Sequence, residues 1–168
     1  MEWDGTGQNP NDYSCIVICE KATSLLNQTN RASLSGTYNL PWGFMFSAFA
    51  QMGSGFPFNV TTGVDNNGDN NTSDRAVING VVVPRDWGQA PALYDFDFAV
   101  AKLFKIGERT SLSLRAESFN TFNHLNTFSR NGTFGNAAAP VSTFGQPVGG
   151  LANVGPPREM QFSARIAF

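Results

Sequence analysis

The chain has 168 residues, a formal net charge of −2 and a pI near 5.3, so it lacks the basic surplus of a nucleic-acid-binding protein. Charged residues make up 14% of the sequence, against about 25% in a typical soluble domain. No apolar run approaches the ~18–20 residues of a transmembrane helix, while fifteen Phe and many Gly, Asn, Thr and Ser residues favour short strands joined by polar loops.

Residues 1–30 are polar and irregular apart from an apolar run at 16–18. Cys15 and Cys19 would lie ~13 Å apart on a strand, which is beyond disulfide reach. Two free thiols are the simpler interpretation, and a disulfide across a looped backbone is the alternative. The spacing of the two cysteines does not match a zinc site.

The first two predicted strands form a hairpin. Residues 31–38 alternate, with apolar side chains on one face and Arg, Ser and Thr on the other. Pro41 and Gly43 mark a tight turn over 39–43, and residues 44–54 alternate again. This second strand could continue through 55–58, where Pro57 would require a bulge or a sheet edge.

Three more strands follow, separated by one long, one short and one long connection. The long connections are 61–93 and 120–157, the short turn is 106–109, and the strands are 94–105, 110–119 and 158–168. In the last strand Met160, Phe162, Ala164, Ile166 and Phe168 share one face, and polar residues dominate the other.

Strands of about ten residues with apolar and polar faces, joined by alternating short and long links, are typical of transmembrane β-barrels. We therefore predict an all-β fold: an antiparallel meander of about five transmembrane strands, an incomplete part of a large outer-membrane β-barrel. With Phe168 at the periplasmic end, the turns at 39–43 and 106–109 are periplasmic. The connections at 61–93 and 120–157 are then extracellular, and residues 1–30 are the remnant of another extracellular loop. The alternative is a secreted β-sandwich that binds carbohydrate through loop aromatics.

An outer-membrane protein must be exported, yet the stretch Met1–Gly5 has neither the basic nor the apolar region of a signal peptide. We therefore expect the chain to be a fragment. An aromatic girdle is expected at the periplasmic interface, and Lys102 could snorkel there. The girdle residues are Tyr38, Trp42, Phe44, Phe104 and Phe168. On the polar face, Arg115 and Glu117 could pair with Asp97 or Glu159 on neighbouring strands.

The best candidate for a binding site is a loop with oxygen-bearing side chains at alternate positions, which suits Ca²⁺. Its candidate ligands are Asp65, Asn67, Asp69, Asn71 and Asp74. The match to an EF-hand is poor, since position twelve is Ala76, and a hydrated turn is the simpler interpretation. No other cofactor is expected.

No catalytic constellation is present, so we do not expect an enzyme. His124 is the only histidine and is expected in a loop or interface role, while Asn120 and Asn123 are expected to cap turns. Phe134 and Phe144 recur in two Thr-Phe-Gly triplets. They are expected to fold onto the barrel rim or to contact a ligand.

Several segments resemble the C-terminal end of TonB-dependent outer-membrane receptors, in particular the type with a carboxypeptidase-regulatory-like N-terminal domain. The segments are Tyr38–Gly43, Ser54–Phe58, Gly63–Asp69 with Asp74-Arg75, Asp97–Phe104, Arg115–His124 and Pro157–Phe168. The resemblance covers Asn30 to Phe168, and residues 1–30 match poorly.

The resemblance implies a barrel of about twenty-two strands with a plug domain and a TonB box, in the bacterial outer membrane, that takes up scarce nutrients. Neither plug nor box is in this chain, so we expect a wall segment that cannot transport alone. The implied partners are outer-membrane lipid, the remainder of the barrel and the plug, the barrel assembly machinery, and TonB through the missing N-terminal part. Phe162, Ile166 and Phe168 resemble the signal that the assembly machinery reads.

Overall fold

The computed structural model describes residues 20–148 and 155–168 and divides the chain into two compact units. The strand unit comprises Asn30–Gly53, Ala92–Asn126 and Gly155–Phe168, and the loop unit comprises the described parts of Met1–Thr29, Ser54–Pro91 and Thr127–Val154. Among the described residues, no helix is long and apolar enough to cross a membrane.

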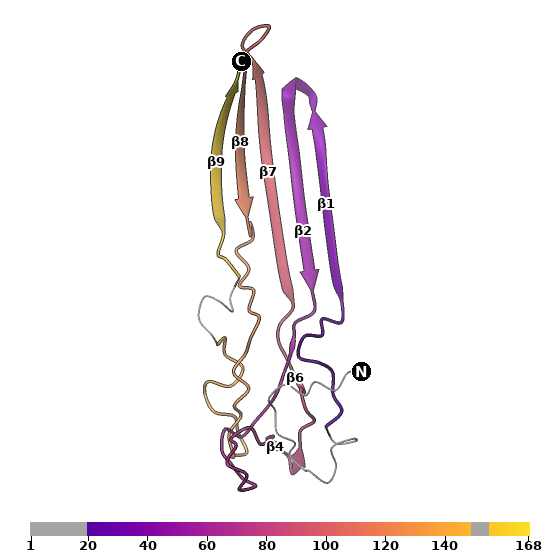
Figure 1. Cartoon of the computed structure of the whole chain (residues 1–168), viewed down its shortest axis with the longest axis vertical. Coiled ribbons are helices and arrows are strands. Elements are labelled where there is room, and N and C mark those ends of the chain that lie inside the picture. Colours follow the sequence, from indigo (N-terminus) through magenta and orange to yellow (C-terminus); the bar gives the residue numbers. More distant parts are fainter. Residues whose placement is uncertain (1–19, 149–154) are drawn as a thin grey trace. The chain divides into compact units, whose positions relative to one another are not determined.

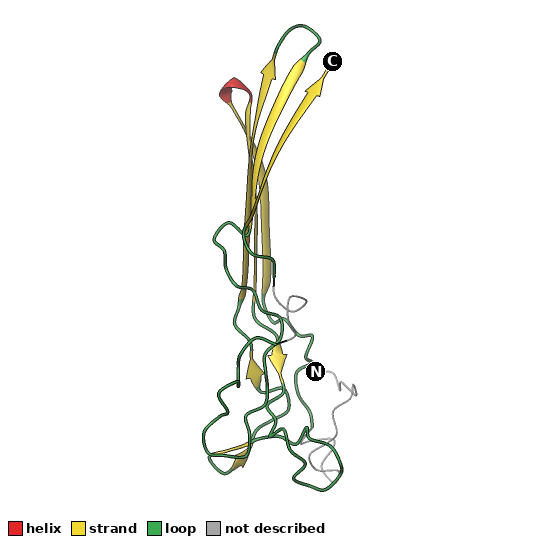
Figure 2. Ribbon diagram, turned by 90° about the vertical axis from the view of Figure 1, so that its left-hand side faces the viewer, coloured by secondary structure: helices red, strands yellow, loops and turns green. Residues whose placement is uncertain are grey.

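The strand unit is a single antiparallel sheet, seen face-on in Figure 1 and edge-on as one twisted layer in Figure 2. Its strands lie in the order β1-β2-β7-β8-β9. They are β1 (Arg31–Leu40), β2 (Phe44–Gly53), β7 (Leu93–Lys105), β8 (Ser111–Phe119) and β9 (Glu159–Ala167). All five strands are within two residues of the predicted ranges, and the meander is confirmed.

The two short links lie at the same end of the sheet, because alternate strands run in opposite directions (Figure 1). One is a 3-10 turn, η2 (Pro41–Gly43), with Trp42 at φ 63° and Gly43 at φ 77°. The other is closed by a hydrogen bond from the Ile106 N–H to the Thr110 carbonyl, 2.9 Å. The long connections leave the sheet at its other end.

β2 stops at Gly53, so the predicted continuation through residues 55–58 is wrong. Pro57 and Phe58 instead form the short strand β3 (Pro57–Phe58), which pairs with β6 (Gly88–Gln89) in the loop unit. Pro57 lacks a backbone N–H, and a two-residue ladder on an edge tolerates that loss.

The loop unit has a core of its own. Val60, Ala76, Val83 and Phe134 are buried together, and Phe58, Ile78 and Phe144 pack against them. Phe134 and Phe144 meet edge to face, with ring centroids 5.3 Å apart. The two Thr-Phe-Gly aromatics therefore pack on each other inside this core. The expectation that they fold onto the barrel rim or contact a ligand is wrong for Phe134, whose side chain is buried.

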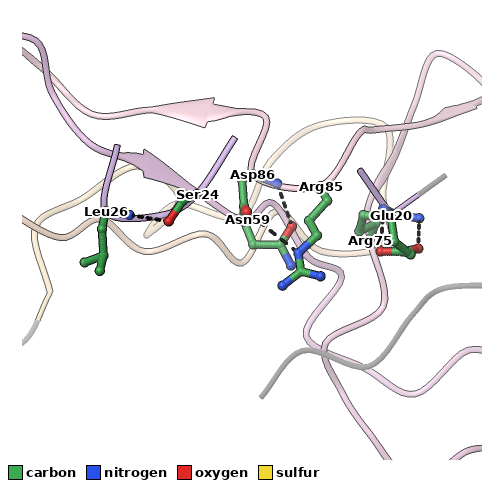
Figure 3. A network of polar contacts seen from close by, with 7 residues as sticks. All are labelled: Glu20, Ser24, Leu26, Asn59, Arg75, Arg85 and Asp86. Carbon is green, nitrogen blue, oxygen red and sulfur yellow. Dashed lines mark hydrogen bonds and ion pairs between the residues drawn. The ribbon is translucent and has the colours of Figure 1, made fainter. Parts of the chain in front are cut away.

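Two further features order the loop unit. β4 (Val77–Ile78) and β5 (Val81–Val82) form a hairpin around Asn79-Gly80, both at positive φ, which is a favoured two-residue turn. The Arg75 guanidinium binds the Glu20 carboxylate through two contacts of 2.6 and 3.1 Å, and both side chains are buried (Figure 3). This pair fixes the described start of the chain to residues 61–91.

Candidate functional site

The five strands share one parity, so that every even-numbered strand residue lies on one face of the sheet. The register pairs Ala50 with Leu34 on one side and with Phe96 on the other, and Leu114 with Lys102 and Ala164. This face is almost wholly apolar because nearly all of the even strand positions hold apolar residues. They include Leu34, Tyr38, Phe44, Phe46, Ala48, Met52, Phe96, Phe98, Val100, Leu112, Leu114, Met160, Phe162 and Ile166.

The apolar face stays open to the outside of the molecule. Leu34 is 75% exposed, Phe162 78% and Ile166 63%, and the Phe46 and Phe98 rings stack on its surface with centroids 6.2 Å apart. A soluble sandwich would bury such a face against a second sheet. Monomeric soluble proteins rarely expose apolar patches of more than a few hundred Å². The face therefore suits contact with lipid.

The opposite face is mainly polar and carries the charged residues of the five strands apart from Lys102. Arg115 binds Glu117 on the same strand, with 2.7 Å between Nη2 and Oε1. The expected pairing across strands with Asp97 or Glu159 is wrong, because Arg115 stands opposite Ala101 and Ser163, and Glu117 opposite Ala99 and Gln161. Around this ion pair the face is hollowed to about 330 Å³, with Ser35, Thr37, Ser47 and Asp97 among the lining.

The turn end of the sheet gathers aromatic side chains around one ammonium group. The Lys102 Nζ donates a hydrogen bond to the Trp42 carbonyl and lies 4.1 Å from the centre of the Phe44 ring. Lys102 thus leaves the apolar face for the turn, as predicted for a snorkelling side chain. Tyr38, Trp42 and Phe104 belong to the same end of the sheet and are exposed, and Phe168 is 99% exposed.

The other end of the sheet is held by asparagine side chains, which confirms the predicted caps. The Asn120 backbone N–H donates to Asp97 Oδ1 at 2.9 Å, and its side chain donates to the carbonyls of His124 and Pro156. Asn123 Oδ1 accepts from the Arg158 N–H at 3.0 Å. His124 stacks edge-on against Tyr94, with centroids 5.3 Å apart, so it serves packing at this rim.

The predicted calcium loop uses its oxygens to hold its own backbone. Asp65 accepts N–H bonds from Gly68 at 2.6 Å and from Asn70 at 2.9 Å, and Asp74 accepts from Asn66 at 2.6 Å. Asn67, Asp69 and Asn71 each accept a bond from the N–H two residues on, the geometry of Asx turns. Within the described ranges, three or more acidic, His or Cys side chains never gather as a metal site. Calcium binding stays a prediction.

Hydrogen bonding also changes the pKa of the Asp65 carboxyl group in this loop. Desolvation raises the pKa of Asp65, but backbone N–H groups of Asn70, Gly68, Asp69 and Asn67 outweigh it, and the pKa lies below the ordinary value of 3.8. The Asp65 carboxylate therefore stays ionised and keeps the turn closed at neutral pH.

Two other predictions concern the last strand and the two cysteines. Phe162 and Ile166 project from the apolar face of β9, and Phe168 follows the strand; a role in assembly stays a prediction. Cys15 and Cys19 lie outside the described residues, as does the apolar run at 16–18.

The sequence patterns miss a hollow in the loop unit. Arg130, Phe128, Phe56 and Leu25 line it, and only Phe56 stands in a segment for which a strand is predicted. One signal was present in the chain: Arg130 is the only Asp, Glu, Lys or Arg between Glu117 and Arg158. A single charged residue in so long a neutral stretch, close to aromatic residues in the sequence, indicates a candidate binding position.

Comparison with known proteins gives one family. Residues 81–161 match the model of an outer membrane beta barrel domain, a range that runs from β5 through β7 and β8 to the first three residues of β9. No curated protein and no solved structure gives a significant match. The all-β antiparallel fold with an open sheet and the family match agree, and the chain is an outer-membrane protein of bacteria.

Proposed function

We propose that the strand unit is a section of the barrel wall of a TonB-dependent receptor that takes up scarce nutrients. The observation that carries the proposal is the shared parity: four successive strand pairings keep every even position on one apolar, exposed face. In a barrel this face meets lipid and the face with Arg115 and Glu117 lines the lumen. The TonB-dependent type rests on the resemblance of the segments between Asn30 and Phe168.

The end of the sheet with Trp42 and Lys102 faces the periplasm in this proposal, because bacterial barrels have short periplasmic turns and long extracellular loops. The loop unit is then extracellular. The partners are outer-membrane lipid, the remaining strands and plug of the receptor, the assembly machinery and TonB. We expect the chain to perform no covalent chemistry and to carry no cofactor other than the predicted calcium.

Neighbouring positions on opposite faces of the sheet test which face meets the lipid. After Cys15 and Cys19 are replaced by Ser, single cysteines are placed at Ser47 or Ala48 on β2 and at Ser163 or Ala164 on β9. Each variant is labelled with an environment-sensitive fluorophore and reconstituted with lipids brominated on their acyl chains. We expect quenching at positions 48 and 164 and little at 47 and 163. Equal quenching within each pair would remove the lipid-facing assignment.

A second experiment separates energised uptake from passive permeation. The gene that encodes the chain is disrupted, and uptake of labelled ferric chelates, cobalamin and oligosaccharides is compared with and without an uncoupler of the inner membrane. A receptor of the proposed type loses one of these uptakes on disruption and on uncoupling. Uptake that depends on the gene but survives the uncoupler would indicate a passive outer-membrane channel.

A further inference from the structure

The hollow in the loop unit is lined by four segments that are far apart in the sequence, at 25–26, 56–59, 90 and 128–130. The Ala90 N–H donates to the Phe56 carbonyl at 2.9 Å, beside the β3–β6 ladder. On the other side, the Thr61 N–H donates to the Gly132 carbonyl at 2.9 Å, and Thr61 forms a parallel bridge with Thr133. Residues 56–61 therefore run between residues 88–90 and 128–134, and the wall of the hollow is backbone-bonded on both sides.

Two glycines allow this close packing. A Cβ at Gly132 would lie 1.9 Å from the Asn59 carbonyl oxygen, and one at Gly88 would lie 2.5 Å from the Phe58 ring. The Phe58 ring also contacts Phe144, with centroids 6.3 Å apart. The Phe58 ring is thus held in place before any ligand arrives, which lowers the entropy cost of binding.

The hollow has a volume of about 380 Å³, which lies in the range of small-molecule sites. Its lining is mostly apolar and includes Leu25, Phe56, Phe58 and Phe128. The polar groups are few, and Arg130 is the charged one among the lining residues. A mostly apolar cavity with a few polar groups is the usual form of a ligand site.

The Arg130 guanidinium is incompletely satisfied. Its Nη1 donates to the Gly145 carbonyl at 3.0 Å, but its Nε is buried and has no hydrogen-bond partner among the described residues. None of the ion pairs found in the described ranges includes Arg130. A buried donor without a partner is costly, and a guanidinium prefers a planar, bidentate anion such as a carboxylate.

We propose that this hollow binds a small amphipathic anion: an aromatic or alicyclic ring carrying a carboxylate. The ring lies among Phe56, Phe58 and Phe128, and the carboxylate pairs with Arg130. The anion supplies acceptors to the guanidinium beside apolar rings, where the low local polarity makes such a pair stronger than in bulk water. This site is independent of the proposed transport role, because it is built within the loop unit alone.

The probe for the test is 1-naphthoate, compared with its neutral isostere 1-naphthalenemethanol. The full chain is reconstituted in lipid nanodiscs and titrated by saturation-transfer NMR, with empty nanodiscs as the blank for partition into lipid. We expect 1-naphthoate to bind with a Kd of about 1 mM or tighter and the alcohol to bind about tenfold more weakly. Equal binding of the two ligands, or no binding of 1-naphthoate above the blank, would overturn the proposal.

Variants locate the anion at Arg130. Arg130→Gln should weaken 1-naphthoate about tenfold and leave the alcohol unchanged, while Arg130→Lys should recover part of the loss because the charge remains. Arg109→Gln, in the turn of the strand unit, is the matched control and should change neither ligand. Since Arg130 also holds the Gly145 carbonyl, the amide spectrum of each variant is compared with that of the native chain. Undiminished naphthoate binding by Arg130→Gln would exclude this site.

Discussion

At the scale of single residues, backbone geometry fixes identities that side-chain contacts do not explain. Gly43 has φ 77°, and a Cβ there would lie 2.8 Å from the Leu103 carbonyl oxygen. Gly36 lies within β1, where an added Cβ would meet nothing within 4 Å. The two glycines therefore provide a matched pair, since one is required by its turn and the other is not.

We expect Gly43→Ala to lower the free energy of unfolding by about 1–3 kcal/mol through strain and the clash. Gly36→Ala should change it by less than about 0.5 kcal/mol. Urea unfolding in detergent micelles measures both. An equally large loss of unfolding free energy in Gly36→Ala would mean that the conformation of the turn does not cause the loss in Gly43→Ala.

The lowered pKa of Asp65 gives the loop unit a pH dependence. A carboxylate whose pKa is lower in the folded protein stabilises the fold above the unfolded value, near 3.8, and this stabilisation is lost as the pH falls through the folded value. Hydrogen exchange at the Gly68 and Asn70 amides should therefore speed up below the ordinary pKa of Asp, after correction for intrinsic rates. Asp65→Asn should remove that dependence, while the Val100 amide of β7 serves as the internal control. Unchanged protection in acid would contradict the role of Asp65.

At the scale of elements, the strands followed from the sequence because each carries its own period. Alternation in residues 94–105 or 158–168 needs no knowledge of the rest of the chain. The loop unit could not be read in this way. Its core joins Val60, Ala76 and Phe134 from segments without periodicity, and contacts so distant in sequence leave no local signal. The β4–β5 hairpin is the exception, since Asn79-Gly80 is a recognised turn signal.

Charge pairing shows the same limit. The partners of Arg115 depended on register, which alternation does not determine. The Asn120 cap could be predicted because its side chain bonds the nearby backbone of His124, whereas the bond between Asn123 and Arg158 depends on the fold. The Arg130 Nε, which has no hydrogen-bond partner among the described residues, could be recognised only from the three-dimensional arrangement of residues 56–61 and 128–134.

Shared parity makes the central strand sensitive to a one-residue slip. Inserting one Ala between Phe98 and Ala99 in β7 would move the following side chains to the opposite face, against both β2 and β8. We expect this variant to lose cooperative unfolding or protection from protease in micelles. The same insertion between Gly107 and Glu108, in the exposed turn, should be tolerated. Equal tolerance at both sites would show that the fold does not depend on which face of the sheet the β7 side chains occupy.

At the scale of the whole molecule, the open apolar face and the two outer strands β1 and β9 govern behaviour in solution. Exposed strand edges and apolar faces promote association. The chain should aggregate in plain buffer and gain its β signal in far-UV circular dichroism when micelles are present. Sedimentation with and without micelles completes the measurement. A monomeric, cooperatively folded chain in plain buffer would contradict the lipid-facing assignment.

A paired substitution assigns that behaviour to one face. Phe46→Asn alters the apolar face and Phe49→Asn the opposite one, three residues apart on β2. Only Phe46→Asn should reduce the amount of detergent bound per chain. Equal effects would mean that detergent binds both faces alike.

The contrast between the two ends of the sheet has a consequence for how such a chain can diversify. At the end with Gly43, the link is closed by a residue that already touches the main chain of β7, so it leaves no room for growth. At the end with Asn120, the connections form a separately packed unit whose length is not set by strand pairing. Insertions, deletions and recombination are therefore tolerated at the border of the sheet with Asn120 and removed by selection at the Gly43 turn. Relatives of this chain should differ in size almost wholly through that permissive border.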